Sequence, residues 1–244
     1  MAARRHVGGS GCPLLLAVET SCGTPSVALL RGEELLAEEQ AAAGRSGAEG
    51  LLPCVDAVLR RAGLALEAVE AFAISIGPGS FTGLRIGVAT LKGFAFGTEL
   101  PIAPVPTLAV LARAAPDALD PVVALVDARR GEFYAAAYRL EGAGREPLPC
   151  EPAEGVYTPE QLAPRLPPAC LLVGEGVALC GERLRALARS DVRLGPAAEP
   201  HARDVGILGA RRIARGEAVA AAALLPHYVR RAEAEVKRTG QRFE

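Results

Sequence analysis

The feature that most constrains the fold is an apolar run that passes through a glycine-rich loop into an apolar helix. Residues 71–76 form a short hydrophobic run bounded by glycine, which is typical of a central strand. The loop contains Gly77, Gly79, Ser80, Thr82 and Gly83, and we expect a helix over about residues 82–96. A strand, a tight loop and a helix in this order predict an α/β fold, with a sheet covered by helices.

The segments around this block extend the α/β pattern. Residues 14–18, 26–30 and 34–40 predict three antiparallel strands joined by short turns. Leu51, Leu52, Val55, Val58 and Leu59 recur on one face of a helix, and Pro53 fits its first turn. A strand at residues 101–105 and a helix at 108–115 complete the order βββαβαβα, which indicates a mixed sheet.

The pattern restarts near residue 121 and predicts a second lobe. Residues 122–126 and 133–140 form a hairpin, a loop with one short helix near 159–166 covers residues 142–168, and a strand at 171–173 precedes helices at 179–187 and 204–214. We therefore expect a flexible leader (1–12), an N-terminal lobe (13–117), a C-terminal lobe (118–225) and a charged tail (226–244). The last helix of the C-terminal lobe can pack back on the first lobe.

Composition excludes several classes of protein. The 244 residues are 50% hydrophobic with a formal net charge of -1, which argues against disorder and against a field that could capture nucleic acid unaided. The longest stretch without a charged residue is 71–84, which is too short and too rich in glycine to span a membrane. The six cysteines form no CxxC pair, so we expect them to be reduced. The protein is expected to be cytoplasmic.

The glycine loop admits two interpretations that the spacing does not separate. Its backbone N–H groups and the following helix N-terminus could bind an anion. Alternatively, the glycines could simply allow close packing of the helix. A nucleotide loop of the Walker type is excluded, because no Lys-Ser or Lys-Thr pair follows at the required spacing.

Candidate catalytic groups are few. Glu19 and Asp127 follow predicted strands, where they could hold a ligand or cap their own loops, and both readings stay open. Ser21, Cys22 and Ser80 lie in or near loops, but no base can be assigned to any of them. The histidines (His6, His201 and His227) are not spaced for a shared metal site. We therefore predict no catalytic residue, no metal site and no cofactor of its own.

The glycine-rich helix predicts a surface for a partner protein. Only Arg85 and Lys92 are charged between residues 82 and 97, and the helix is apolar on two faces. One face can pack on the sheet and the other on a partner, although burial within one domain is the alternative. The predicted interface comprises Leu51, Leu52, Val55, Leu59, Leu84, Val88, Leu91 and Ala95. The mixed-charge segment 228–238 is expected to be a solvated tail rather than an RNA clamp.

Four motifs together resemble the TsaB (YeaZ) family of bacterial proteins. They are residues 16–21 with 26–29, the block Gly-Pro-Gly-Ser-Phe-Thr-Gly-Leu-Arg-Ile-Gly at 77–87, the segment 126–134, and the closing motif His-Tyr-Val-Arg-Arg at 227–231. The resemblance is closest over residues 13–140. One departure is the loop before the first helix, which reads Arg-Ser-Gly-Ala-Glu at 45–49 where many relatives carry a histidine.

This resemblance implies a two-lobed actin-like (ASKHA, ribonuclease H-like) fold and a non-catalytic subunit. Such a subunit supports TsaD, with TsaE, in N6-threonylcarbamoylation of adenosine 37 of tRNAs that read codons beginning with adenine. The family's two early helices form its dimerisation surface and correspond to about residues 47–62 and 82–97, so a homodimer is expected when the chain is alone. ATP and metal are expected on the catalytic partner, and tRNA contact only through the complex. The alternative is an ATP-dependent kinase or a peptidase-like enzyme of the same superfamily.

Overall fold

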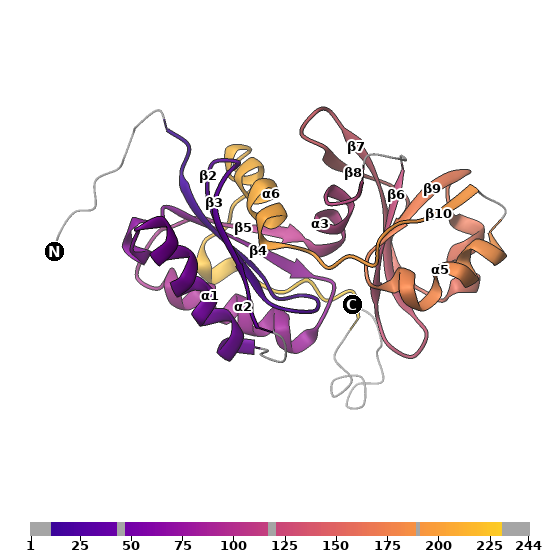
Figure 1. Cartoon of the computed structure of the whole chain (residues 1–244), viewed down its shortest axis with the longest axis horizontal. Helices are drawn as coiled ribbons and strands as arrows, with labels where there is room; N and C mark the ends of the chain where they lie inside the picture. The colour runs from indigo at the N-terminus through magenta and orange to yellow at the C-terminus, as the bar shows by residue number, and fades with distance from the viewer. Residues whose placement is uncertain (1–10, 43–46, 117–120, 189–190, 231–244) are drawn as a thin grey trace.

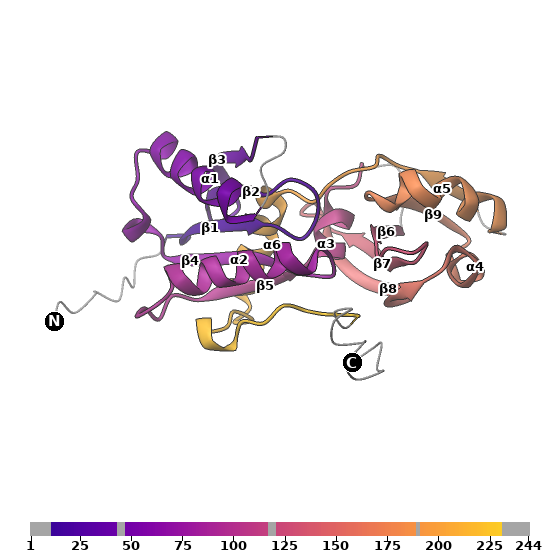
Figure 2. The same cartoon turned by 90° about the horizontal axis from the view of Figure 1, so that it is seen from below.

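The computed structural model describes residues 11–42, 47–116, 121–188 and 191–230. These residues form two five-stranded mixed sheets that lie end to end, with helices packed on their faces (Figures 1 and 2). The predicted α/β class, with two lobes whose mixed sheets are flanked by helices, is confirmed by this arrangement.

The first sheet has the order β3-β2-β1-β4-β5. Strands β1, β2 and β3 run antiparallel, whereas β4 and β5 run parallel to β1. The parallel strands end at one edge of the sheet, which brings the loops after β1 and β4 together. The strands are β1 (Leu14–Glu19), β2 (Ser26–Arg31), β3 (Glu34–Gln40), β4 (Ala71–Gly77) and β5 (Ile102–Pro106).

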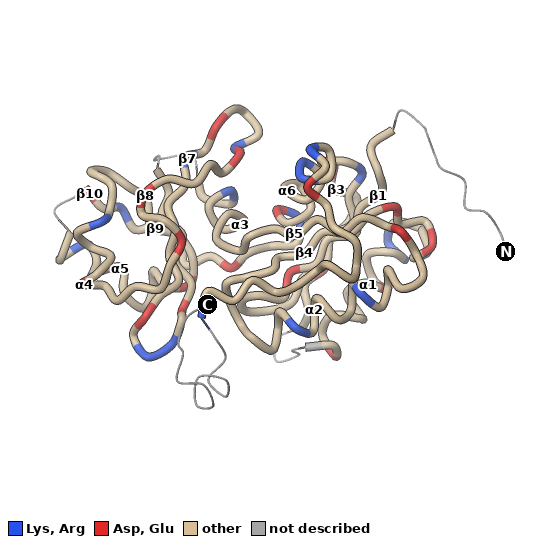
Figure 3. Tube along the Cα trace, turned by 180° about the vertical axis from the view of Figure 1, so that it is seen from behind, with Lys and Arg blue, Asp and Glu red and all other residues tan. Residues whose placement is uncertain are grey.

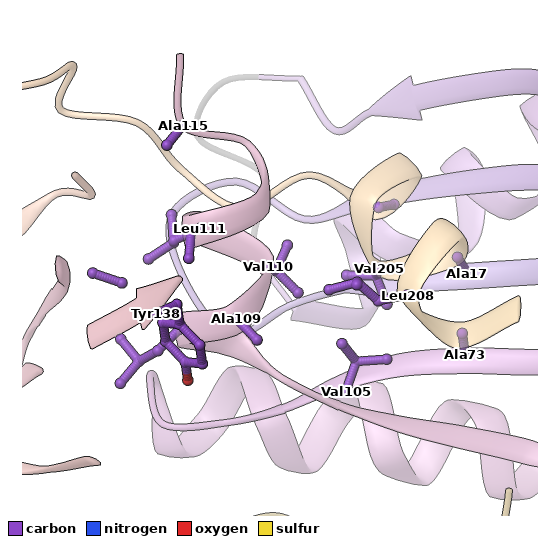
Figure 4. Packing of buried hydrophobic residues seen from close by; sticks show 14 of the residues in the cluster. Ala17, Ala73, Val105, Ala109, Val110, Leu111, Ala115, Tyr138, Val205 and Leu208 are labelled. Atoms are coloured by element: carbon purple, nitrogen blue, oxygen red, sulfur yellow. The ribbon is translucent and has the colours of Figure 1, made fainter. Parts of the chain in front are cut away.

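Helices cover both faces of this sheet. On one face, α1 (Gly47–Ala62) and α2 (Phe81–Phe94) contact each other and cover a cluster that includes Leu16, Val18 and Phe72. On the other face lies α6 (Ala202–Ala214), against β1, β2, β4 and β5. Small residues allow that close approach, since Ala17 and Ala73 face α6 (Figure 4).

The second sheet has the order β10-β9-β6-β7-β8. Helix α5 (Gly176–Leu187) and the short α4 (Pro159–Leu162) cover one face, whereas α3 (Thr107–Arg113) packs on β6 and β7 from the other. One buried cluster joins α3, α6 and both sheets, with Val110, Leu208 and Tyr138 among its members (Figure 4). The strands are β6 (Val122–Asp127), β7 (Phe133–Glu141), β8 (Glu146–Tyr157), β9 (Ala169–Val173) and β10 (Asp191–Leu194).

Three expectations about elements are corrected. Residues 146–157, expected within a loop, form the strand β8, whose prolines are tolerated because β8 is an edge strand. The edge strand β10 was not predicted at all. Pro53 lies inside α1 rather than in its first turn, because the helix already begins at Gly47, before any apolar periodicity is visible.

The two chain ends lie largely outside the described residues. Of the predicted leader, only residues 11 and 12 are described, and the predicted tail is described as far as Arg230. Among the described helices, none is both long and apolar enough to cross a bilayer.

Candidate functional site

A cavity of about 360 Å³ opens where loops from both sheets meet. It lies beyond the carboxyl ends of β1, β4 and β6, which is where open α/β sheets place ligands. Its walls combine the glycine loop, the turn after β1, the β6–β7 turn and the chain near its C-terminal end. The lining residues include Ser21, Cys22, Gly79, Ser80, Phe81, Thr82, Asp127, Arg129, Arg130, Tyr134, Glu175, His227, Tyr228 and Arg230.

The glycine loop packs tightly against the turn after β1. The Ser80 amide donates to the Ser21 carbonyl at 2.6 Å, and a Cβ atom at Gly79 or Gly83 would collide with the backbone of Ser21 or Thr20. The Ser80 hydroxyl caps α2 by accepting from the Gly83 amide at 3.2 Å. Because two amides of the loop are used internally, this geometry favours the close-packing interpretation over the anion site.

Gly77 meets a second constraint. Its φ of 122° is open to glycine alone, and an added Cβ would lie 2.5 Å from the carbonyl oxygen of His227. The amide of His227 also donates to the carbonyl of Ile76 at 2.7 Å. The glycine loop therefore packs directly against a segment near the C-terminal end of the chain.

Residues 226–230, here called the closing segment, join this loop to the second sheet. Tyr228 stacks on Phe81 with ring centroids 5.0 Å apart, and His227 Nε2 lies 2.5 Å from a carboxylate oxygen of Glu154 in β8. Arg230 pairs with Glu132 at 2.8 Å. The expectation of a solvated tail over residues 228–238 is therefore wrong for Tyr228 and Arg230, because these side chains contact residues far away in the sequence.

Glu19 is buried inside the first sheet rather than placed on the cavity wall. One carboxylate oxygen accepts from both the amide and the hydroxyl of Ser21 at 2.5 Å, and the other has no partner among the described residues. Burial raises the pKa of Glu19 to about 7, against a smaller lowering by the hydrogen bonds from Ser21. Glu19 thus stabilises its own turn, as the loop-capping alternative stated.

Asp127 also serves its own loop. Its carboxylate accepts from the Arg129 amide at 2.7 Å and lies 3.4 Å from the Arg129 guanidinium, while its backbone amide donates to Glu175 at 3.2 Å. The turn that follows holds Arg129 at φ 68° and Arg130 at φ 58°, a left-handed conformation that costs about 1–3 kcal/mol at each such residue. Sequence reasoning did not single out these arginines, although they lie in the third family motif.

The other candidate groups do not assemble into a catalytic set among the described residues. The Ser21 hydroxyl is engaged by Glu19, and burial raises the pKa of Cys22 well above its usual range, so its thiol stays protonated. His201 Nδ1 lies 3.9 Å from a carboxylate oxygen of Glu38, and His6 lies outside the described residues. Within the described ranges, no group of three or more His, Cys, Asp or Glu side chains could hold a metal ion.

The predicted partner surface has the wrong residues. Seven of its eight members face the sheet and are at most 8% exposed, namely Leu51, Val55, Leu59, Leu84, Val88, Leu91 and Ala95. They form the core beneath α1 and α2 because a helix on a sheet buries its more apolar stripe first. Leu52, at 48% exposed, is the one member of the predicted set that faces outward.

A different set of apolar groups faces outward from these helices. Ala89 and Gly93 of α2 are exposed, Thr90 is half-buried, and Phe96 just beyond α2 is 88% exposed. Ile86 is half-buried and packs in part against the core. Ile86, Thr90 and Gly93 make up a second uncharged face of α2, opposite the face that is buried on the sheet. The sequence pattern of two apolar faces is therefore present in the folded helix, and the second face is the one that is partly exposed to solvent.

Comparison with known proteins relates most of the chain to proteins of threonylcarbamoyladenosine synthesis. The family model described as tRNA N6-adenosine threonylcarbamoyltransferase (TsaD) matches residues 39–238. The tRNA threonylcarbamoyladenosine biosynthesis protein TsaB of Escherichia coli is 33% identical over 227 residues, covering 88% of this chain and 94% of that protein. TsaB of Haemophilus influenzae is 44% identical over 123 residues, about half of each chain (49% and 51%).

A solved structure agrees with these relatives. The crystal structure of a Pseudomonas aeruginosa protein, described as similar to peptidase YEAZ, has a TM-score of 0.79 at 36% identity and covers 89% of this chain and 100% of that one. With the fold, the motifs and near-complete coverage in agreement, the chain belongs to the TsaB (YeaZ) family.

Proposed function

We propose that this chain is a non-catalytic scaffold and activator of a TsaD-type subunit. Together with TsaE, that complex would transfer the threonylcarbamoyl group to N6 of adenosine 37 in tRNAs that read codons beginning with adenine. The observation that carries the proposal is membership of a family whose relatives are named for threonylcarbamoyladenosine biosynthesis. ATP and metal would be bound by the catalytic partner, in the cytoplasm.

Among the residues that the structure describes, no candidate groups converge into a catalytic set, which supports an accessory role over an enzyme. Phosphoryl transfer needs a carboxylate that can reach the metal or the attacking group. In the described cavity Asp127 is held by Arg129 and Glu175 accepts from the Asp127 amide, while Glu19 is buried behind Ser21 and does not line the cavity. The kinase alternative would therefore require one of these carboxylates to break its present contacts.

The outward face of α1 and α2 supplies the surface for the partner. Leu52, Ala89, Gly93 and Phe96 are exposed and carry no charge. Glycine and alanine on α2 allow a helix of the partner to approach closely, and apolar area is the main source of association free energy. We propose that a second copy of the chain occupies the same face when the catalytic subunit is absent, which gives a homodimer.

Reconstitution of the tRNA modification tests the proposal. Purified TsaD and TsaE, tRNA, ATP and the threonylcarbamoyl precursor are combined with and without this chain, and the modified nucleoside is measured by mass spectrometry. We expect product only when the chain is present and none from the chain alone. Calorimetry of the chain with Mg-ATP is the second arm, and binding with turnover there would favour the kinase alternative.

A further inference from the structure

The cavity gathers a disproportionate share of the chain's aromatic rings. The whole sequence has six Phe, four Tyr and no Trp, and three of these ten rings, Phe81, Tyr134 and Tyr228, line this one cavity. Three arginines, Arg129, Arg130 and Arg230, line it as well. Rings beside guanidinium groups are the combination with which proteins hold the bases and phosphates of single-stranded nucleic acid.

The turn that carries two of these arginines is held rigidly. We call residues 128–132 the arginine hairpin. The Ala128 amide donates to the Glu132 carbonyl at 3.0 Å, and the Glu132 amide donates to the Arg129 carbonyl at 3.1 Å. Arg230 of the closing segment donates to the Ala128 carbonyl at 3.1 Å. Hydrogen bonds from two parts of the chain therefore fix a turn with three consecutive left-handed residues, Arg129, Arg130 and Gly131, of which two are arginines.

Among the charged groups that line the cavity, the guanidinium of Arg129 faces solvent. Arg230 is neutralised by Glu132 at 2.8 Å, and Glu175 accepts from the Asp127 amide. The Arg129 side chain is 85% exposed, and its contact with Asp127 is long at 3.4 Å. Blue and red segments are interspersed over the face of the molecule in Figure 3, so any attraction for a polyanion is local to a site such as this hairpin.

We propose that the arginine hairpin binds a backbone phosphate of the tRNA substrate, and that the ring of Tyr134 in the cavity wall contacts an adjacent base. This inference rests on the proposed function for the identity of the RNA. The site requires a ligand with one phosphate group and one base that can stack on an aromatic side chain. A free nucleotide also offers both groups. RNA fits better than Mg-ATP, because a backbone phosphate needs no metal and the nearby carboxylates are already engaged by Ser21 and Arg129.

The test uses the full chain within the reconstituted complex and a fluorescein-labelled anticodon stem-loop RNA. The variant Arg129→Asn/Arg130→Gly removes both guanidinium groups and installs residues that favour the same turn, so the hairpin is retained. Its matched control, Arg165→Ala/Arg193→Ala, removes two exposed arginines that lie outside this cavity. Fluorescence anisotropy at several salt concentrations gives the affinity and its salt dependence, and AMP and ATP are titrated in parallel.

We expect the hairpin variant to bind the stem-loop about 5-fold or more weakly, with a salt slope shallower by about 1–2, whereas the control stays close to wild type. Tyr134→Leu is expected to weaken binding with the salt slope unchanged. Equal affinity of wild type and hairpin variant would overturn the proposal, as would binding of ATP but not RNA at the hairpin. Product formation that needs the chain, together with unchanged RNA affinity, would refute this inference while leaving the proposed function intact.

Discussion

Two glycines of α2 show how differently a single methyl group would act within one helix. A Cβ atom at Gly87 would collide with the hydroxyl of Thr20 and lie 3.0 Å from Ile74, whereas a Cβ at Gly93 would meet nothing within 4 Å. We expect Gly87→Ala to lower the free energy of unfolding by about 1–3 kcal/mol through overpacking. Gly93→Ala should raise it by about 0.5–1 kcal/mol, since alanine is the better helix former. Urea unfolding checks both, and equal midpoints would contradict the different packing of these two glycines.

Glu19 predicts how stability changes with pH. Burial raises its pKa from 4.5 in the unfolded chain to about 7 in the folded protein, so the folded state holds the proton more tightly. The free energy of unfolding should then fall as the pH rises between these two values, by at most about 3 kcal/mol, and stay low at higher pH. Glu19→Gln cannot lose a proton and should remove this slope. Thermal or urea unfolding across that pH range measures this dependence. If the free energy of unfolding of Glu19→Gln still falls with rising pH, another group must cause the fall.

At the scale of elements, the orientation of α1 and α2 separates substitutions that unfold the chain from those that break a complex. Leu84 and Val88 are buried against the sheet, so Leu84→Glu or Val88→Glu should unfold the protein rather than leave a folded monomer. Leu52→Glu and Ala89→Glu place the charge on the outward face. These two variants should melt close to wild type and yet fail to bind the TsaD-type partner in size-exclusion chromatography.

A matched control exists on the second sheet. Leu179 of α5 is 63% exposed, so Leu179→Glu adds the same charge at a similar apolar site away from α1 and α2. We expect this variant to bind the partner normally. If Leu179→Glu abolished binding while Leu52→Glu did not, the interface would have to be moved to α5.

At the scale of the whole molecule, Arg211 links the two sheets. Its guanidinium, 15% exposed, contacts Glu33 in the turn between β2 and β3 at 2.7 Å and Glu146 of β8 at 2.9 Å. The hydrogen bond from Arg211 lowers the pKa of Glu33. Removing one partner of a largely buried ion pair leaves charges without compensation. Because Glu33 is half-exposed, we expect Arg211→Met to cost about 1–3 kcal/mol, below the range for a fully buried pair.

The comparison for Arg211 is an ion pair within one helix. Arg60 and Asp56 lie one turn apart on α1, with side chains 74% and 66% exposed. Such pairs contribute about 0.3–0.5 kcal/mol. Arg60→Ala should therefore change the urea midpoint little, and an equal loss in both variants would show that Arg211 does not hold the sheets together.

Much of the fold follows from the sequence alone. The strands β1 to β4 and β6, the hairpin into β7 and helices α1, α2 and α6 were predicted within a few residues, because each depends on a local period of apolar residues and on a nearby turn. The family motifs were equally local, and the relatives confirm the assignment they suggested. The sequence does not predict the proline-rich strand β8, because this segment becomes a strand only by pairing with β7, and composition does not reveal that pairing.

Tertiary structure decided the features that join distant parts of the chain. Which face of α2 is buried depends on the sheet beneath it. The position of the closing segment depends on contacts such as that of His227 with Glu154, 73 residues apart. Arg211 finds Glu33 across 178 residues. The sequence therefore determined most of the elements, their order and the family, because these follow from neighbours along the chain. Only the folded structure decided which side chains are exposed to water and which contact each other, since those contacts form between residues that no local pattern relates.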